Sequence, residues 1–117
     1  MNSVNLTGRL TADPELRYTT DEKPRTTFSL AVDRPHTKDK TDFPRIVVFG
    51  NLAETVARYL TKGRMVAVSG SVQTGSYTNR DGQKVYTTDI VADSVEFLDK
   101  PKQDNDKPKQ ENGWGDL

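Results

Sequence analysis

The stretch FPRIVVFGNLAETVARYLTKGRMVAVSGSV, residues 43–72, contains two strand-like runs separated by a helix-like run. Residues 45–50 are rich in β-branched side chains and end at a glycine, which is typical of a strand. Residues 51–63 space their apolar side chains at helical intervals, and apolar and small polar residues then alternate up to residue 72. The order strand, helix, strand therefore restricts the fold more than any other segment.

The helix in this stretch has recognisable boundaries. Asn51 is the predicted N-cap, because Glu54 follows three residues later as in a capping box. Gly63 is the predicted stop. The apolar residues that fall on one face of this helix are Leu52, Val56, Tyr59 and Leu60.

Three further strand candidates flank the stretch. The first lies within residues 4–10 and ends near Asp13-Pro14, and the second covers residues 27–32. The run 73–91 is a hairpin that joins the fourth strand to the third new candidate, which is the fifth strand of the chain. Its Asp81-Gly82 supplies the positive φ that the turn needs. Five strands with one helix between the third and fourth predict an all-β protein, a five-stranded OB-fold barrel. An antiparallel sheet covered by a helix would use the same elements.

A change in composition near residue 99 divides the chain. Residues 1–99 hold the strands and the helix, whereas residues 100–117 have no strand or helix period and continue the polar repeat DKPKQ. Such a segment cannot bury enough apolar surface to offset the entropy of ordering it. We expect an OB-fold domain over 1–99 and a disordered C-terminal tail over 100–117.

The composition of the chain excludes several function classes. Its 17 Lys and Arg balance 17 Asp and Glu, which argues against duplex-DNA binding through a broad basic field. The chain has no cysteine, one histidine and no phosphate-cradle or nucleophile motif, so we expect no enzyme, no metal site and no cofactor. It has no signal peptide or long apolar run, and we expect a cytoplasmic protein.

Aromatic residues fall on faces that alternation does not assign to the core. Tyr77 has the opposite parity to the core valines of its strand, and Phe43, Arg45, Val47 and Phe49 occupy alternate positions. Rings and a guanidinium on one face can stack on bases and contact phosphate. Packing of Phe49 and Val47 into the barrel, or beneath a second subunit, stays open, although burying an unpaired arginine beside them would be costly.

Three segments together resemble bacterial or phage single-stranded DNA-binding proteins. They are NSVNLTGRLTADPELRY (2–18), the stretch 43–72 and YTNRDGQKVYTTDIVADSVEFL (77–98). The resemblance is continuous over nearly all of residues 1–99. Its strongest elements are Gly8-Arg9-Leu10, Asp13-Pro14-Glu15, Val48-Phe49-Gly50 and Tyr86-Thr87-Thr88.

The resemblance implies an OB-fold protein, usually a homotetramer, that binds single-stranded DNA without reading its sequence in replication, recombination and repair. It also implies a cytoplasmic, nucleoid-associated protein. The family's phosphate-facing cations fall at Arg45 and Lys62. Its stacking rings fall at His36, Phe43, Phe49 and Tyr77.

The chain departs from the family at several of these positions. Members often carry tryptophan where this chain has His36, Phe43 and Tyr77, and basic residues where it has Gly75 and Ser76. We therefore expect weaker binding per subunit and a shallower dependence of affinity on salt than in a tryptophan-rich, basic relative.

The C-terminal tip departs as well. The family typically ends in an acidic run closed by Pro-Phe, which docks replication and repair enzymes. Here Trp114, Asp116 and Leu117 keep an acidic and apolar character without that run or the proline. A partner-binding tip is our hypothesis, and an inert solubilising tail is the alternative.

Two other functions use the same residues. The first is an OB-fold protein-interaction adaptor resembling primosomal replication proteins, in which the Phe43 and Phe49 face contacts protein. The second is an RNA-binding OB module, because stacking surfaces discriminate poorly between the two polymers.

Overall fold

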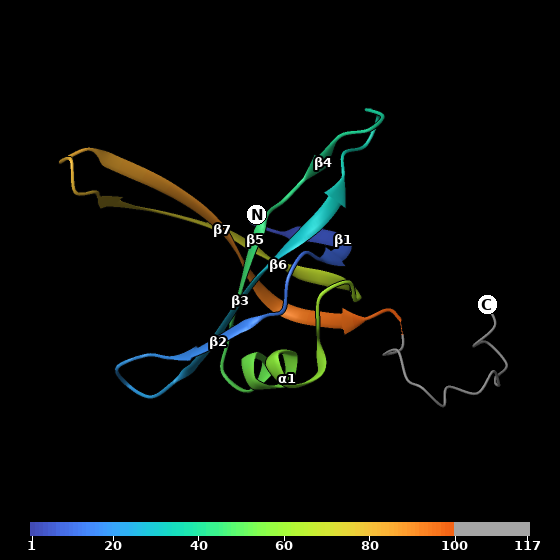
Figure 1. Cartoon of the computed structure of the whole chain (residues 1–117), viewed down its shortest axis with the longest axis horizontal. Coiled ribbons are helices and arrows are strands. Elements are labelled where there is room, and N and C mark those ends of the chain that lie inside the picture. The colour runs from blue at the N-terminus through green and yellow to red at the C-terminus, as the bar shows by residue number, and fades with distance from the viewer. Residues whose placement is uncertain (100–117) are drawn as a thin grey trace, which may run out of the picture.

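The computed structural model describes residues 1–99 as a strand-rich domain with one helix (Figure 1). The predicted tail 100–117, with Trp114, Asp116 and Leu117, lies outside the described residues. No helix in the described part of the chain is long and apolar enough to cross a membrane. The elements are β1 Val4–Leu10, β2 Glu15–Tyr18, β3 Pro24–Asp33, β4 Thr41–Asp42, β5 Arg45–Phe49, α1 Asn51–Tyr59, β6 Met65–Thr78 and β7 Lys84–Phe97.

The five long strands close into a ring. They follow the order β1-β6-β7-β5-β3, and β3 returns to β1 through the pairs Arg9↔Ala31 and Leu10↔Leu30. Strands β5 and β7 run parallel, whereas the other neighbours in the ring are antiparallel. The predicted five-stranded OB-fold barrel, with its helix between the third and fourth long strands, is confirmed. The open antiparallel sheet is excluded.

The barrel interior is filled by the alternate residues of each strand, as period two requires. α1 covers one end of the barrel (Figure 1) and contributes Ala53 and Val56 to the core. The buried Thr26 hydroxyl on β3 donates a hydrogen bond of 2.7 Å to the Ala53 carbonyl, which fixes the helix against the barrel. The other core residues are Leu10, Phe28, Leu30, Ile46, Val48, Leu60, Val66, Val68, Ile90 and Ala92.

A β-bulge changes the register of β6 and β7 within the barrel. The pairing passes from Ser69↔Ser94 to Gly70↔Ala92, which leaves Asp93 without a partner. Before the bulge the core-facing residues of β7 are the even-numbered Ile90 and Ala92, and after it they are the odd-numbered Val95 and Phe97. Such a bulge bends the strands that it interrupts.

Beyond the barrel, β6 and β7 continue as a two-stranded arm (Figure 1). Every residue of β6 from Val72 onward is exposed. The turn matches the prediction, because Gly82 has a φ of 81°. The Asn79 side-chain oxygen accepts hydrogen bonds from the backbone N–H groups of Asp81 and Gln83, which closes the turn.

The structure corrects the predicted helix boundaries. Asn51 is the first helical residue and not the cap; Gly50 is the N-cap, with a φ of 75° and no side-chain cap hydrogen bond. The helix ends at Tyr59, four residues before Gly63, and Tyr59 is exposed although it was placed on the apolar face. The short strands β2 and β4 were not predicted.

Candidate nucleic-acid interface

Three of the predicted site residues lie on one surface of the barrel and arm. Val47 of β5 faces Val91 of β7, which in turn faces Ser71 of β6. Arg45 and Phe49 share the parity of Val47, and Tyr77 shares that of Ser71, so all three point away from the core. We call this surface, with Asp89 of β7, the outer face. Phe49 is 48% exposed and Tyr77 57% exposed.

Arg45 is the central cation of the outer face. Its Nε lies 3.6 Å from Asp89 Oδ1, and its side chain is about half exposed. Arg45 also lines an open pocket of about 310 Å³ together with Asp13. The guanidinium is thus accessible from solvent and restrained by one carboxylate.

Lys62 lies beside this pocket, in the turn between α1 and β6. Its backbone N–H donates a hydrogen bond of 2.8 Å to the Asp13 carboxylate, while the residue itself is exposed. Lys62 is therefore joined through Asp13 to the pocket that Arg45 lines. This backbone hydrogen bond relates Lys62 to the Arg45 pocket, and the Lys62 side chain itself does not line that pocket.

The predicted stripe of Phe43, Arg45, Val47 and Phe49 is only partly correct. Val47 is 3% exposed, because Thr27 and Val91 face it from the neighbouring strands. Phe43 lies before the start of β5, where the backbone at Phe43 and Pro44 is not strand, so strict alternation does not reach it.

Phe43 instead lines a groove at the mouth of the barrel. This mouth groove has a volume of about 600 Å³, and Phe43 is 63% exposed at its edge. Its other lining residues are mainly apolar and come from several strands and the loop before β4. They include Val4, Leu6, Val32, Pro35, Val72 and Ile90.

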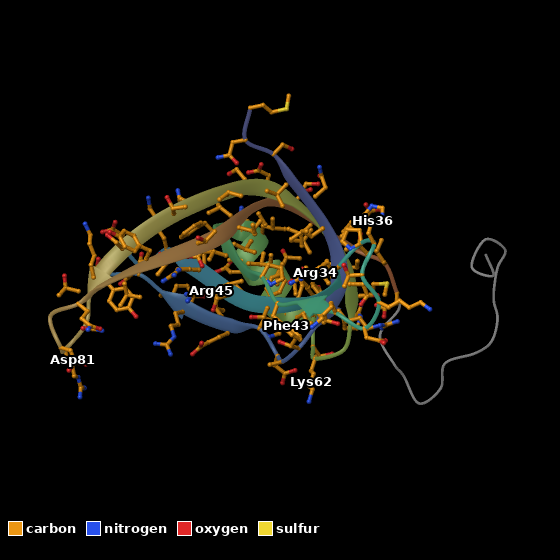
Figure 2. The ribbon with its side chains drawn as sticks, turned by 90° about the horizontal axis from the view of Figure 1, so that it is seen from above. Arg34, His36, Phe43, Arg45, Lys62 and Asp81 are labelled. Atoms are coloured by element: carbon orange, nitrogen blue, oxygen red, sulfur yellow. The ribbon has the colours of Figure 1, made fainter. Side chains whose placement is uncertain are left out.

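His36 follows Pro35 in the loop between β3 and β4 and is exposed, with a φ of 66°. An ion pair of 2.6 Å between Arg34 Nη2 and Asp42 Oδ1 closes the base of this loop. Hydrogen bonding from Arg34 lowers the pKa of Asp42 below its ordinary value. Figure 2 shows His36 on the opposite side of the view from Asp81 at the arm tip, with Arg45 between them. His36 and Phe43 thus belong to the mouth-groove end of the molecule.

Tyr86 is an exposed ring that the site prediction did not include. It is 74% exposed, and the Lys84 ammonium lies 5.6 Å from its ring centroid. Because Tyr86 faces Ser76 across the arm, it points to the opposite side from Tyr77. Tyr86 shares the parity of the buried Ile90, so alternation assigns it to the core side and gave no signal of its exposure.

No cluster of three or more histidine, cysteine, aspartate or glutamate residues within residues 1–99 could hold a metal ion. The candidate site consists of exposed rings and cations along two connected surfaces. This arrangement can stack planar groups and bind anions.

Comparison with known proteins places this arrangement in context. A family model described as "Single-strand binding protein family" matches residues 1–98. A single-stranded DNA-binding protein of Clostridium perfringens is 50% identical over 100 residues, covering 85% of this chain and 67% of the relative. One from Staphylococcus aureus is 46% identical over 110 residues, covering 91% of this chain and 70% of the relative.

A solved structure shares the fold. The chain titled "Plasmodium falciparum SSB complex with ssDNA" superposes with a TM-score of 0.75 at 34% sequence identity. The match covers 85% of this chain and 96% of that one.

Proposed function

Because the chain belongs to the single-strand binding protein family, we propose that it binds single-stranded DNA without reading its sequence and protects it in replication, recombination and repair. The observation that carries this proposal is the outer face, where the exposed rings of Phe49 and Tyr77 flank the half-exposed Arg45. Membership of this family of binding proteins agrees with the expectation that the chain is not an enzyme.

Each group on the outer face has a distinct role in the proposed mechanism. Phe49 and Tyr77 stack on bases, and stacking tolerates any sequence because every base has a π-face. Arg45 and Lys62 contact phosphates, which positions the strand without reading it. Gln73 of β6 lies opposite Asp89, and β6 advances about 3.3 Å per residue from there to Tyr77. A DNA strand lying along the arm can therefore contact both Arg45 and the Tyr77 ring.

Phe43 and His36 provide a second contact region at the mouth groove. Phe43 is exposed at the groove edge and presents a ring for stacking, and His36 lies in the adjacent loop. We propose that Phe43 and His36 contact the DNA strand where it passes from the outer face over the end of the barrel.

Titration of labelled oligonucleotides tests the function. Fluorescein-labelled oligo-dT, oligo-rU and a duplex of equal length are followed by anisotropy at low and moderate salt, with the wild type and with Phe43→Ala/Tyr77→Ala. We expect tight oligo-dT binding, little duplex binding and a large loss in the double variant. Equal weak binding of oligo-dT and duplex that the variant does not change would overturn the proposal. Preference for oligo-rU would favour an RNA-binding module.

We propose that the protein acts as a homo-oligomer, with a tetramer favoured. Within residues 1–99, β1 from Val4 to Gly8 pairs with β6 alone, which leaves its other edge available for a second copy. Val4 and Leu6 also line the mouth groove, so a copy on this edge would cover apolar surface. Light scattering of the purified protein measures the subunit number directly.

The protein-interaction adaptor is the second candidate function, because the mouth groove is mostly apolar and includes the exposed Phe43. It predicts a stable dimer that binds oligonucleotides poorly. The same anisotropy titration separates it from DNA binding.

The tip of the tail is a proposed docking site for replication and repair proteins, through Trp114, Asp116 and Leu117. Deletion of residues 111–117 should abolish pull-down of such an enzyme and leave DNA affinity intact or raised. Unchanged pull-down would assign the tail a solubilising role only. A cytoplasmic, nucleoid-associated location is part of the same proposal, and imaging of a tagged protein in cells checks it.

A further inference from the structure

A second pocket on the outer face contains more cations than the site prediction assigned. It has a volume of about 280 Å³ and is lined by Glu15, Arg17, Arg25, Thr27 and Arg45. Three guanidinium groups therefore surround one small open space, with a single carboxylate among them. The pocket begins at Arg45 and extends across β3 to β2, away from the arm.

Two of these arginines are placed directly against each other. Arg17 of β2 and Arg25 of β3 are cross-strand partners, and Arg25 also faces Phe49 of β5. Directly opposed side chains in a sheet lie about 5 Å apart at Cβ, and like charges there are destabilising. The row Arg17, Arg25, Phe49 therefore combines an unfavourable charge pair with an exposed ring on the adjacent strand.

The carboxylates near the pocket do not compensate all three cations. Arg17 donates from Nε to Glu15 Oε2 at 3.0 Å, and Arg45 is paired with Asp89. Arg25 forms no ion pair within residues 1–99, and its buried Nε has no hydrogen-bond partner there. Because this Nε is buried, an external ligand does not reach it, and the support for an anion in the pocket comes from the three guanidinium groups that line it with a single carboxylate.

We propose that Arg25, together with Arg17 and Arg45, binds a backbone phosphate of the nucleotide whose base stacks on Phe49. This assignment rests on the proposed function and adds a site to it. Guanidinium groups bind phosphate oxygens through paired N–H donors, which suits a pocket with several convergent arginines. Adjacent β-strands lie about 4.8 Å apart, so a DNA strand with a base stacked on Phe49 has its phosphate backbone within reach of Arg25 on the neighbouring β3.

Glu15 acts as a competitor in this site. It occupies Arg17 in the free protein through hydrogen bonds to both Nε and Nη2. A phosphate entering the pocket would take over the Arg17 donors and meet repulsion from Glu15. The bound strand therefore continues from β5 across β3 toward β2, and Glu15 moderates the affinity of that part of its path.

The salt dependence of binding tests the site. Anisotropy titrations with oligo-dT over a range of salt concentrations compare the wild type with Arg25→Gln, Arg25→Lys and Glu15→Gln. Arg58→Gln on α1 is the matched control, because it removes the same charge from a residue that does not line this pocket. Each lost phosphate contact lowers the slope of log K against log salt by about 0.7 for a single strand.

We expect Arg25→Gln to lower the slope by about 0.7, Arg58→Gln to leave it unchanged and Glu15→Gln to raise affinity. Arg25→Lys should keep the slope but weaken binding several-fold, because lysine keeps the charge and loses the paired donors. The site is overturned if Arg25→Gln keeps the wild-type slope of log K against log salt. It is also overturned if Arg25→Lys binds oligo-dT with the affinity of the wild type. If the site is overturned but Phe43→Ala/Tyr77→Ala still loses binding, single-stranded DNA binding stands without the Arg25 site. If the wild type does not bind oligo-dT, the proposed function and the Arg25 site both fail.

Discussion

Arg45 and Asp89 face each other across the parallel pair β5–β7, with the Arg45 Nε 3.6 Å from Asp89 Oδ1. The side chain of Asp89 is 25% exposed and that of Arg45 53% exposed, so the pair is accessible to solvent on the outer face. A phosphate that binds Arg45 must compete with this carboxylate. Carboxylates such as Asp89 offset the charge of the cations beside them. The chain can therefore have no net charge and still present cations along the proposed DNA path.

Asp89→Asn should tighten binding of oligo-dT. The change removes a negative charge beside the proposed phosphate contact and releases Arg45 from its partner. Exposed ion pairs contribute up to about 1 kcal/mol, so we expect a gain of about two- to fivefold at low salt. Anisotropy titration measures it, and a gain that persists undiminished at high salt would contradict an electrostatic cause.

Phe49→Ala should weaken oligo-dT binding by about five- to 150-fold, because loss of one stacked base costs about 1 to 3 kcal/mol. Tyr59→Ala is the matched control, since Tyr59 is an exposed ring on α1, away from the outer face. Its affinity should equal that of the wild type. Equal losses in the two variants would show that the effect is not specific to the outer face.

Alternation along single strands predicted much of this fold and of the site. It identified the five long strands and placed Tyr77 away from the core, because both depend on residues two apart in sequence. It failed at Val47, whose burial depends on Thr27 and Val91 of the neighbouring strands. It also failed at Phe43, where Pro44 interrupts the strand.

Other features depend on contacts that no local pattern contains. The opposition of Arg17 and Arg25 follows from the register between β2 and β3, and β2 itself was not predicted. The helix cap was misassigned because Gly50, whose positive φ turns the chain into α1, leaves Asn51 already helical. A capping-box pattern cannot reveal that backbone angle.

Gly70→Ala should destabilise the barrel. A Cβ on Gly70 would stand 2.0 Å from the Val91 carbonyl oxygen, so the backbone at the bulge would have to move. Forcing extra volume into packed structure costs about 1 to 3 kcal/mol, and a backbone obstacle places this change at the upper end. Urea denaturation followed by circular dichroism measures the loss.

Gly75→Ala on the arm is the control for that experiment. Its Cβ would lie 3.3 Å from the Thr87 hydroxyl, a side chain that can move. We expect a change in the free energy of unfolding within about 0.5 kcal/mol, as for most surface substitutions. If the two glycine variants unfold at the same urea concentration, the close approach at the bulge does not restrain the barrel.

A cluster around Asp99 fixes the end of the described domain to the start of β6. Arg64, whose side chain is 9% exposed, donates from Nε to Asp99 Oδ1 at 2.9 Å, and the Met65 backbone N–H lies 3.3 Å from the same carboxylate. Burial raises the pKa of Asp99, but the hydrogen bonds from Arg64 and Met65 and the charges of Arg64 and Arg9 outweigh it. The pKa is therefore held below its ordinary value.

The lowered pKa predicts how this cluster responds to acid. A carboxyl group with a folded pKa below the unfolded value, about 3.9, stabilises the protein above that value, and the contribution is lost as the pH falls through the folded pKa. Asp99→Asn should thus lower the free energy of unfolding by about 1 to 2 kcal/mol at pH 7, because the nearly buried Arg64 loses its charged partner. The difference from wild type should stay constant down to about pH 5 and shrink below about pH 4.

Urea denaturation of both proteins from pH 7 to pH 3 measures this difference. Asp93→Asn is the control, because Asp93 is exposed in the bulge and forms no ion pair within the described domain. Its stability should follow that of the wild type at every pH. A difference between Asp99→Asn and wild type that persists unchanged at pH 3 would mean that Asp99 acts through packing and not through its charge.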